Sequence, residues 1–167
     1  MTHLELASNA IRDGGAAAVA DSEALTGLTH LNLHGNQIGD PGIAALADAE
    51  LLEGVTHLDL SGNDFGVPGA EALANSEQLS GLTHLDLRDT YLGDEAIAII
   101  VESANVSRVT HLTLRSTDLG AAGARAIASS VQLRRLEYLD LTDNRLGDEA
   151  RRALGHSSHL SDDILEM

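Results

Sequence analysis

Five histidines recur at intervals of 27 residues along this 167-residue chain, and a tyrosine takes the sixth place. The members of this row are His3, His30, His57, His84, His111 and Tyr138. A second row, in which acidic residues predominate, stands two positions further on and contains Glu5, Asn32, Asp59, Asp86, Thr113 and Asp140. Imidazole and carboxylate groups bind metals such as zinc or nickel, titrate near neutral pH and pair with charged groups of a partner. Which of these applies depends on how the fold places the two rows.

The two rows belong to a repeat that runs almost the whole length of the chain. Units begin at Met1, Leu28, Val55, Leu82, Val109 and Leu136 and are called units 1 to 6 below. In unit 3, Leu58 and Leu60 alternate with polar residues, as in a short strand with one buried face. Small and apolar residues from position 69 to 74 then follow a helical pattern. We expect Asp40, Asp94 and Asp148 to cap the helices that start beside them.

One strand and one helix in each unit predict an α/β solenoid. Helices are roughly 10 Å wide and parallel strands lie about 4.8 Å apart, so the helices take the convex face and the parallel sheet lines the concave face. The six repeats of 27 residues are expected to form one domain over residues 1–162, with 163–167 as a tail outside the pattern. Because side chains alternate along a strand, the third and fifth positions of each unit face outward on the sheet.

The pattern LxxLxLxxNxLGDxGAxALA resembles the leucine-rich repeats of the ribonuclease-inhibitor type. Its Gly-Ala-x-Ala-Leu-Ala segment is also similar to the repeats of bacterial proteins such as the GALA effectors of plant pathogens. The resemblance implies recognition of a protein partner through the concave face and its rim, and it implies no reaction. Asn9, Asn36, Asn63 and Asn144 occupy the family's asparagine position, where the amide satisfies backbone groups of adjacent coils. Thr90 and Thr117 replace it in units 4 and 5, where we expect fewer bonds.

The composition limits the classes of partner. The chain has a formal charge of −16, from 26 acidic residues against 10 basic ones. Nucleic acids and anionic membranes would repel it, so a basic protein partner fits better, although solubility alone also explains such a charge. The chain has no cysteine, no secretory signal pattern and no stretch of roughly 20 apolar residues. We therefore expect a soluble, cytoplasmic protein without a cofactor.

The histidine row has three interpretations. Duplication of one unit would copy the imidazoles without a role, or they would form part of a partner-binding surface, or they would form a metal- or pH-responsive array. For the metal array, His57, Asp59, His84 and Asp86 lie on neighbouring strands, but a straight ladder is a poor tetrahedron. Protonation would add positive charge to the concave face, so affinity for a basic partner is expected to fall between about pH 7 and 5. A second histidine group, near the C-terminus and including Asp162, is interpreted as a solvated helix end.

The sequence contains none of the common catalytic motifs, so we expect no enzymatic activity and no metal site. The predicted function is a protein–protein interaction module that binds a partner through the concave face. The candidate binding residues are His30, His57, His84, His111, Tyr138, Asp59, Asp86, Asp140, Arg88, Arg115, Asp89 and Asp143. Two alternatives remain open: a regulator of an enzyme, as in the GTPase-activating repeat proteins with Arg88 or Arg115 on the rim, and a passive spacer or fragment. Self-association through the N-terminal edge strand is a further expectation.

Overall fold

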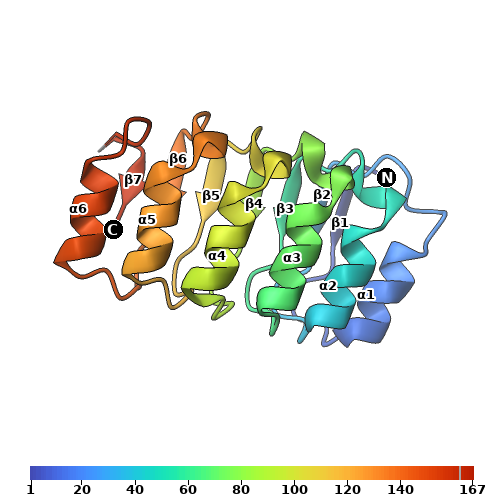
Figure 1. The fold of residues 1–167 in the computed structure, drawn as a ribbon. Helices are drawn as coiled ribbons and strands as arrows, with labels where there is room; N and C mark the ends of the chain where they lie inside the picture. The colour runs from blue at the N-terminus through green and yellow to red at the C-terminus, as the bar shows by residue number, and fades with distance from the viewer. Residues whose placement is uncertain (162) are drawn as a thin grey trace.

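The computed structural model describes residues 1–161 and 163–167 and confirms the predicted solenoid (Figure 1). The described residues form a seven-stranded sheet in which each strand pairs in parallel with the next one along the chain. The strands are β1 (His3–Glu5), β2 (His30–Asn32), β3 (His57–Asp59), β4 (His84–Asp86), β5 (His111–Thr113), β6 (Tyr138–Asp140) and β7 (Leu165–Glu166). From β1 to β6 the paired residues are 27 positions apart, so that His30 lies beside His57 and Asp59 beside Asp86.

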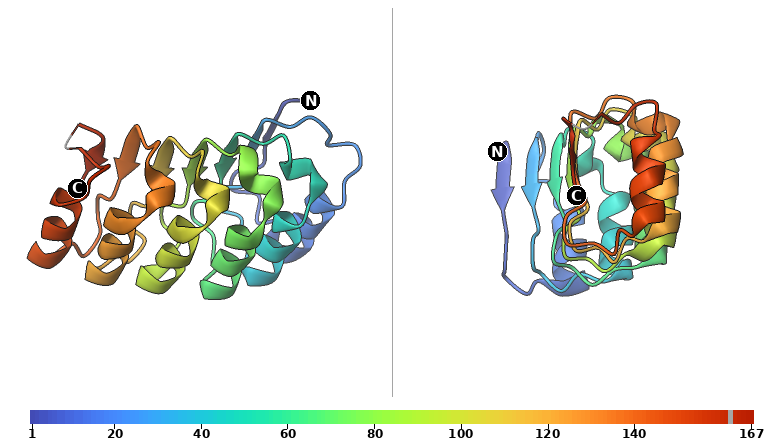
Figure 2. Two further views of the ribbon diagram at one scale, coloured as in Figure 1. Left: turned by 45° about the horizontal axis from the view of Figure 1, so that its top comes forward. Right: turned by 90° about the vertical axis from the view of Figure 1, so that its left-hand side faces the viewer.

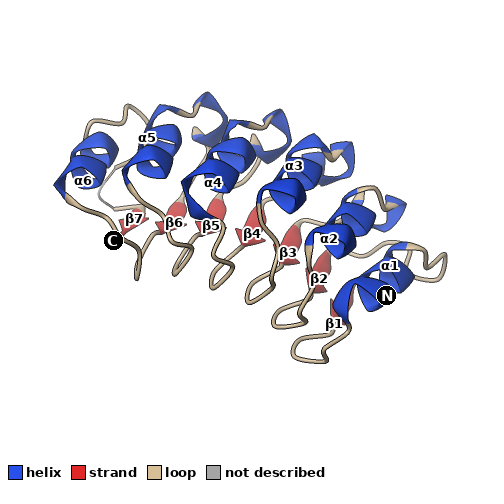
Figure 3. Cartoon of the chain, turned by 60° about the horizontal axis from the view of Figure 1, so that its bottom comes forward, coloured by secondary structure: helices blue, strands red, loops and turns tan. Residues whose placement is uncertain are grey.

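The helices form a second layer on one side of this sheet (Figure 2). They are α1 (Arg12–Ala20), α2 (Asp40–Ala47), α3 (Val67–Asn75), α4 (Gly93–Glu102), α5 (Ala121–Ser129) and α6 (Asp148–Gly155). Short 3-10 turns at Glu50–Leu52, Glu77–Gly81, Ala104–Val106 and Val131–Leu133 return the chain to the next strand. Figure 3 shows the helices on the outer side of the arc and the strands on the inner side, as the difference in their widths predicts.

The core between the two layers is aliphatic. The middle residue of each inner strand, such as Leu31 or Leu112, is buried, and so is the leucine two positions later. Helix residues such as Ile43 and Ile97 pack against them from the other layer. Burial of one such side chain stabilises the fold by about 1.5 to 3 kcal/mol, so the repeated leucines supply most of the driving force for stacking the coils.

The asparagines connect adjacent coils, as predicted from the repeat. Asn63 is 1% exposed, and its side-chain nitrogen donates to the carbonyl oxygens of Leu33 (3.0 Å) and Leu60 (2.9 Å). Its side-chain oxygen accepts the amides of Asn36 (3.1 Å) and Ile38 (3.0 Å) from unit 2. One side chain thus satisfies four backbone groups that the turns would otherwise bury without a partner.

The threonines that replace asparagine make fewer bonds, which confirms that prediction. The hydroxyl of Thr90 donates to the carbonyl oxygen of Leu87 (2.5 Å), and that of Thr117 donates to Leu114 (2.7 Å). Both of these acceptors lie in the threonine's own unit. Within the described residues, no hydrogen bond runs from the Thr90 side chain to unit 3. The inter-coil ladder of amides is therefore interrupted between units 3 and 4 and, at Thr117, between units 4 and 5.

The prediction that Asp40 and Asp94 cap the helices in which they lie is wrong. Asp40 does not cap its own helix: its Oδ1 accepts the amides of Gly66 (2.8 Å) and Gly69 (2.9 Å), at the start of α3 in the next unit. Asp94 likewise accepts the amide of Gly120, at the start of α5. The reason is that stacked helices begin side by side, so the carboxylate reaches the free amides of the following helix.

The tail at 163–167 adds the last strand to the sheet. Leu165–Glu166 forms β7, in which Leu165 pairs with Leu139 and Glu166 pairs with Asp140. The amides of Leu139 and Leu141 donate to the carbonyl oxygens of Ile164 and Glu166, both at 2.7 Å. The pairing has a spacing of 26 residues, and this loss of one residue hides the last strand from the 27-residue pattern. Asp162, where the predicted domain ends, lies outside the described residues.

Candidate functional site

The histidine row is a continuous stack of rings on the concave face. The strands hold equivalent residues in register, and the centroids of successive imidazoles from His3 to His111 are 3.9 to 4.2 Å apart. Their planes differ by 12 to 18°. Tyr138 continues the row at 6.0 Å from His111, tilted by 30°. Because the ring faces cover one another, the ring edges are what a partner can contact.

Each of these imidazoles is held by the threonine that precedes it. In units 2 to 5 the Nδ1 atom lies 2.8 to 3.0 Å from the hydroxyl of Thr29, Thr56, Thr83 or Thr110. Each threonine hydroxyl is also within 3.0 to 3.2 Å of the carbonyl oxygen of the equivalent threonine one unit earlier. The Thr-His pair of the repeat therefore fixes the ring orientation and leaves Nε2 for an external group.

The environment of His57 and His84 favours the neutral form of their imidazoles. Burial first, and then the charges of His84 and the other neighbouring histidines, lower the pKa of His57 below its ordinary value near 6.5. The pKa of His84 is lowered by burial and then by His111 and His30, and Glu137 opposes this in part. No carboxylate of the acidic row is among the causes that shift the pKa of His57.

The acidic row has a structural task that the sequence did not reveal. Asn32, Asp59, Asp86 and Asp140 each accept the backbone amide two residues further on, at 2.8 to 3.1 Å. One oxygen of each side chain therefore closes the turn at the end of the strand. Burial raises the pKa of Asp86, the charge of Asp59 adds to this rise, and the amide and guanidinium of Arg88 oppose it. The row is thus a turn element, in which the second oxygen of Asp86 pairs with Arg88 and that of Asp59 makes no hydrogen bond within the described residues.

Asp140 differs from the other members of this row. It is 9% exposed, and its Oδ1 also accepts the hydroxyl of Thr142 at 2.6 Å. It pairs with Glu166 of β7, while the hydroxyl of Tyr138 donates to the Glu166 carboxylate at 3.1 Å. β7 therefore covers this end of the row, and Asp140 is the least accessible of the predicted contact residues.

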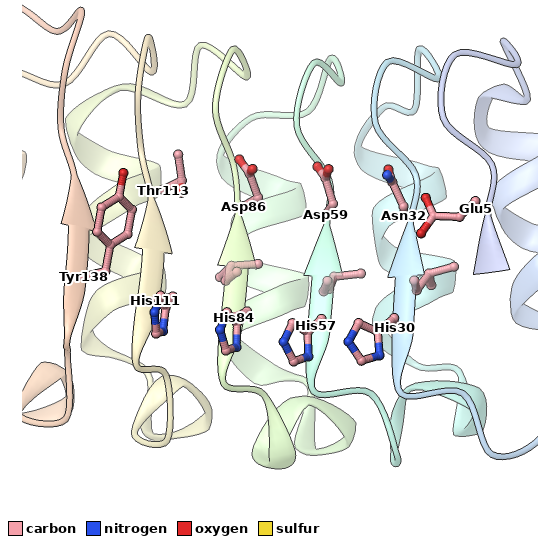
Figure 4. Close-up of a pocket in the computed structure, with 13 residues that line it drawn as sticks. Glu5, His30, Asn32, His57, Asp59, His84, Asp86, His111, Thr113 and Tyr138 are labelled. Atoms are coloured by element: carbon pink, nitrogen blue, oxygen red, sulfur yellow. The ribbon is translucent and has the colours of Figure 1, made fainter. Parts of the chain in front are cut away.

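The two rows line one hollow of about 340 Å³ (Figure 4). The imidazoles of His30, His57, His84 and His111 stand in one line, while Asn32, Asp59 and Asp86 stand in a second line further along the strands. Tyr138 closes the hollow at one end and Glu5 closes it at the other. The hollow thus brings together the predicted histidines and two of the predicted aspartates, on a floor formed by the strands.

The predicted arginines lie beside this hollow and are engaged by carboxylates. Arg88 pairs with Asp86 at 2.7 Å, and Arg115 pairs with Asp143 at 2.6 Å. Both line a second hollow of about 460 Å³ together with Asn32, His34, Asp59 and Asp89. The ion pairs are exposed, so each contributes about 1 kcal/mol or less to stability, and a partner can exchange them for its own charges.

A chain of hydrogen bonds from His34 to Asp59 was not predicted. The hydroxyl of Ser61 donates to Asp59 Oδ1 at 2.5 Å, which uses its one proton, so Nδ1 of His34 donates to the Ser61 oxygen at 2.8 Å. Serine hydrolases combine the same three residue types, but in them the histidine lies between the serine and the aspartate. Here the serine lies in the middle and is fully buried, and its proton points away from the imidazole that would have to remove it. The chain is a rigid support for the turn.

Metal binding and membrane insertion are two further classes of function. No group of three or more histidine, aspartate or glutamate side chains among residues 1–161 and 163–167 is arranged to hold a metal ion. Of the helices in the same ranges, none is long and apolar enough to span a membrane.

Comparison with known proteins identifies the repeat. The profile of the family described as Leucine Rich repeat matches residues 1–20, 25–47, 55–74, 109–128 and 132–155, which together are more than half of the chain. The chain belongs to the leucine-rich repeat family. Leucine-rich repeat domains are in general protein-interaction modules, and this is the functional class of the chain.

Similar solved structures include an internalin. A crystal structure of an internalin from Listeria monocytogenes has 22% sequence identity and a TM-score of 0.46, and the match covers 87% of this chain and 49% of the internalin chain. The leucine-rich repeats described here thus span about half of that protein's length. No curated protein matches the chain in sequence.

Proposed function

We propose that this leucine-rich repeat domain binds a basic segment of a partner protein in the hollow between the histidine and aspartate rows. The observation that supports this proposal most directly is the composition of the hollow: a line of imidazole edges lies beside the carboxylates of Asp59 and Asp86. The Oδ2 of Asp59 makes no hydrogen bond within the described residues, and that of Asp86 is held only by the exposed Arg88. A cationic side chain would lie between these lines and contact both. The charge of −16 steers a basic partner toward the domain, because opposite charges speed diffusional encounter.

Two isosteric substitutions test the proposal without breaking the turns. Asp59→Asn and Asp86→Asn remove two charges, and the amide oxygen can still close the turn, as Asn32 does in unit 2. The control is Glu71→Gln with Glu102→Gln, which removes two charges from exposed positions on α3 and α4 of the other layer. Net charge is the same in both double variants, so any difference between them reports the location of the charges.

The experiment is capture of partners from the source lysate, followed by isothermal titration of the purified partner with each variant. We expect the groove variant to lose affinity by about tenfold or more, because a desolvated ion pair is worth at least about 1.4 kcal/mol, and the helix-face variant to lose less than threefold. Equal losses for the two variants would show that net charge alone attracts the partner and would contradict a groove site.

The finer assignments belong to the same proposal. We propose that the repeats are of the ribonuclease-inhibitor type, that the unit boundaries follow the 27-residue period to residue 162, and that the protein is cytoplasmic and not an enzyme, since it lacks cysteine and common catalytic motifs. Self-association through the free edge of β1 is tested by light scattering over a range of concentrations. The enzyme-regulator alternative needs Arg88 or Arg115 to leave its ion pair, and we regard it as secondary.

A further inference from the structure

Tyr91 is an aromatic residue that the fold leaves uncovered. Its side chain is 81% exposed, whereas Phe65 is 3% exposed and Tyr138 is partly buried in the ring stack. Tyr91 lies on the rim loop of unit 4, which joins β4 to α4 and spans residues 87–92. It occupies the tenth position of the unit, where the six units carry Ala10, Gln37, Asp64, Tyr91, Asp118 and Arg145.

The backbone conformation of this position disfavours tyrosine. Tyr91 has a φ of +49°, in the left-handed region, which is costly for a bulky residue and much easier for glycine or asparagine. Asp89 and Gly93 on either side also have positive φ values, of +57° and +69°. Because the ring is exposed, packing does not offset the cost. The stability of the fold therefore does not explain a tyrosine here.

The rim loop has more residues in the left-handed region than most of its equivalents. Units 2, 3, 5 and 6 have one or two residues with positive φ in this region, whereas unit 4 has three, counting the first residue of α4, as unit 1 also does. Thr90 stands beside Tyr91 and breaks the asparagine ladder. The loop is held between its neighbours by hydrogen bonds from Gly62 N to Arg88 O (2.9 Å) and from Gly93 N to Thr117 O (2.8 Å). A departure from the repeat that persists in a well-bonded loop indicates a role other than folding.

The charges along the rim define the chemistry of a partner. Asp64 and Asp118 hold the positions equivalent to Tyr91 in the preceding and following units. Asp118 pairs with Arg145 at 2.9 Å, whereas the exposed carboxylates of Asp64 and Asp89 have no ion pair within the described residues. An exposed ring beside free carboxylates suits a planar cation, which lies over the ring face and pairs with an acid at its edge.

We infer that the rim loop of unit 4 is a second contact surface, on which Tyr91 receives an arginine side chain of a partner protein. Arginine fits this surface better than lysine, because its guanidinium group stacks on a ring and pairs with a carboxylate through two parallel bonds. The inference goes beyond the proposed function, since Tyr91 does not line the hollow between the histidine and aspartate rows. Aromatic residues and arginines are frequent among the side chains that dominate binding energy, which is the contribution expected of Tyr91 here.

Substitution of Tyr91 by asparagine makes opposite predictions for stability and for binding. Asparagine accepts the left-handed backbone, so Tyr91→Asn is expected to raise Tm by about 2 to 4 °C. The same change removes the ring and is expected to weaken binding of a fluorescent peptide of alternating arginine and glycine by about three- to tenfold at an ionic strength of about 0.15 M. Anisotropy titration measures the affinity. Tyr91→Phe, which retains the ring, should bind the peptide within about twofold of the native chain.

The matched control is Gln37→Asn, at the same position of unit 2. Gln37 is exposed and has a φ of +58°, so the substitution changes the same backbone strain without touching the rim loop of unit 4. It should leave the affinity for the arginine peptide unchanged. If Tyr91→Asn and Gln37→Asn bind the peptide equally well, or if the native chain does not bind it, the inference is wrong.

The same titration separates this inference from the proposed function. Loss of affinity in the Asp59→Asn, Asp86→Asn variant with none in Tyr91→Asn would leave the hollow as the binding site and overturn the inference about Tyr91. The reverse result would support the rim contact and contradict the hollow. Equal binding of a lysine–glycine peptide by the native chain would overturn the assignment of a guanidinium group.

Discussion

The strands of the concave face and the loops of the rim belong to the same repeated unit, but the strand residues vary less from unit to unit than the loop residues do. From β2 to β5, the first residue of every strand is histidine, and its ring lies about 4 Å from the next. On the rim, the residue at the tenth position of the unit differs in chemical class between successive units: it is apolar in unit 1, an amide in unit 2, acidic in unit 3 and aromatic in unit 4. A strand must match its neighbour in hydrogen bonding and side-chain packing, whereas a loop residue that faces solvent has fewer constraints. Specificity for a partner can therefore be altered on the rim with little effect on the stack.

The asparagine ladder gives the strongest test of this contrast. Asn63→Ala is expected to lower the free energy of unfolding by about 3 to 5 kcal/mol, because it leaves several buried backbone groups without partners. Thr90→Ala in the irregular loop should cost only about 1 kcal/mol, since the hydroxyl makes one bond. Urea denaturation followed by circular dichroism measures both values. Equal losses would show that the regular and irregular loops support the fold to the same extent.

The helix starts test the regular part of the molecule a second time. A methyl group on Gly42 would lie 2.6 Å from a methyl carbon of Ile38 and 2.7 Å from Asp13 Oδ1, which accepts the Gly42 amide. Gly42→Ala should therefore destabilise the protein by about 2 kcal/mol through crowding. At Gly14 in α1 a methyl group meets nothing within 4 Å, so Gly14→Ala should stabilise the protein by about 0.5 to 1 kcal/mol. A loss of stability in both variants would contradict this account of helix spacing.

The histidine stack is expected to give the smallest effect, as a pH dependence. Because the folded state lowers the pKa of His57 and His84, the unfolded chain binds more protons as the pH falls below about 6.5. Stability should fall through that range and level off below the folded-state pKa values. His57→Gln with His84→Gln should make the urea midpoint less dependent on pH between 7 and 5. A midpoint that falls as steeply in this variant as in the native chain would assign the dependence to other groups.

Much of the fold follows from the period of the sequence. Identical spacing of Leu31, Leu58 and Leu85 fixes strand register, and alternation then places the histidines and aspartates on one face. The caps could not be assigned in the same way. A carboxylate at a helix start suggests a local bond, and only the stacked helices show that Asp40 reaches the next coil instead. β7 was hidden by a spacing of 26 residues.

The sequence predicts that the candidate site consists of two rows of side chains. It does not predict which of these side chains are accessible to a partner. Burial of Asp140 depends on β7, and the lowered pKa of His57 depends first on its burial and then on the charges of neighbouring histidines; the repeat alone specifies the extent of neither burial. Tyr91 is conspicuous only when its φ angle and exposed fraction are known. Sequence periodicity shows which residues the units share. The residues that would distinguish one partner from another are those at which one unit differs from the rest.

The caps between coils have a mechanical consequence. Asp13 caps α2, Asp40 caps α3 and Asp94 caps α5, each from the unit before. Val67 and Ala121 hold the equivalent position in units 3 and 5 and have no carboxylate, so α4 and α6 lack this cap. The boundary between units 3 and 4 therefore lacks a cap as well as the amide ladder at Thr90, although the strand pairing and the bond from Ser103 Oγ to Ala74 O continue across it. We expect the solenoid to behave as two stiff segments with a softer joint between them. Under tension or thermal agitation, the arc would bend first beside the loop that carries Tyr91.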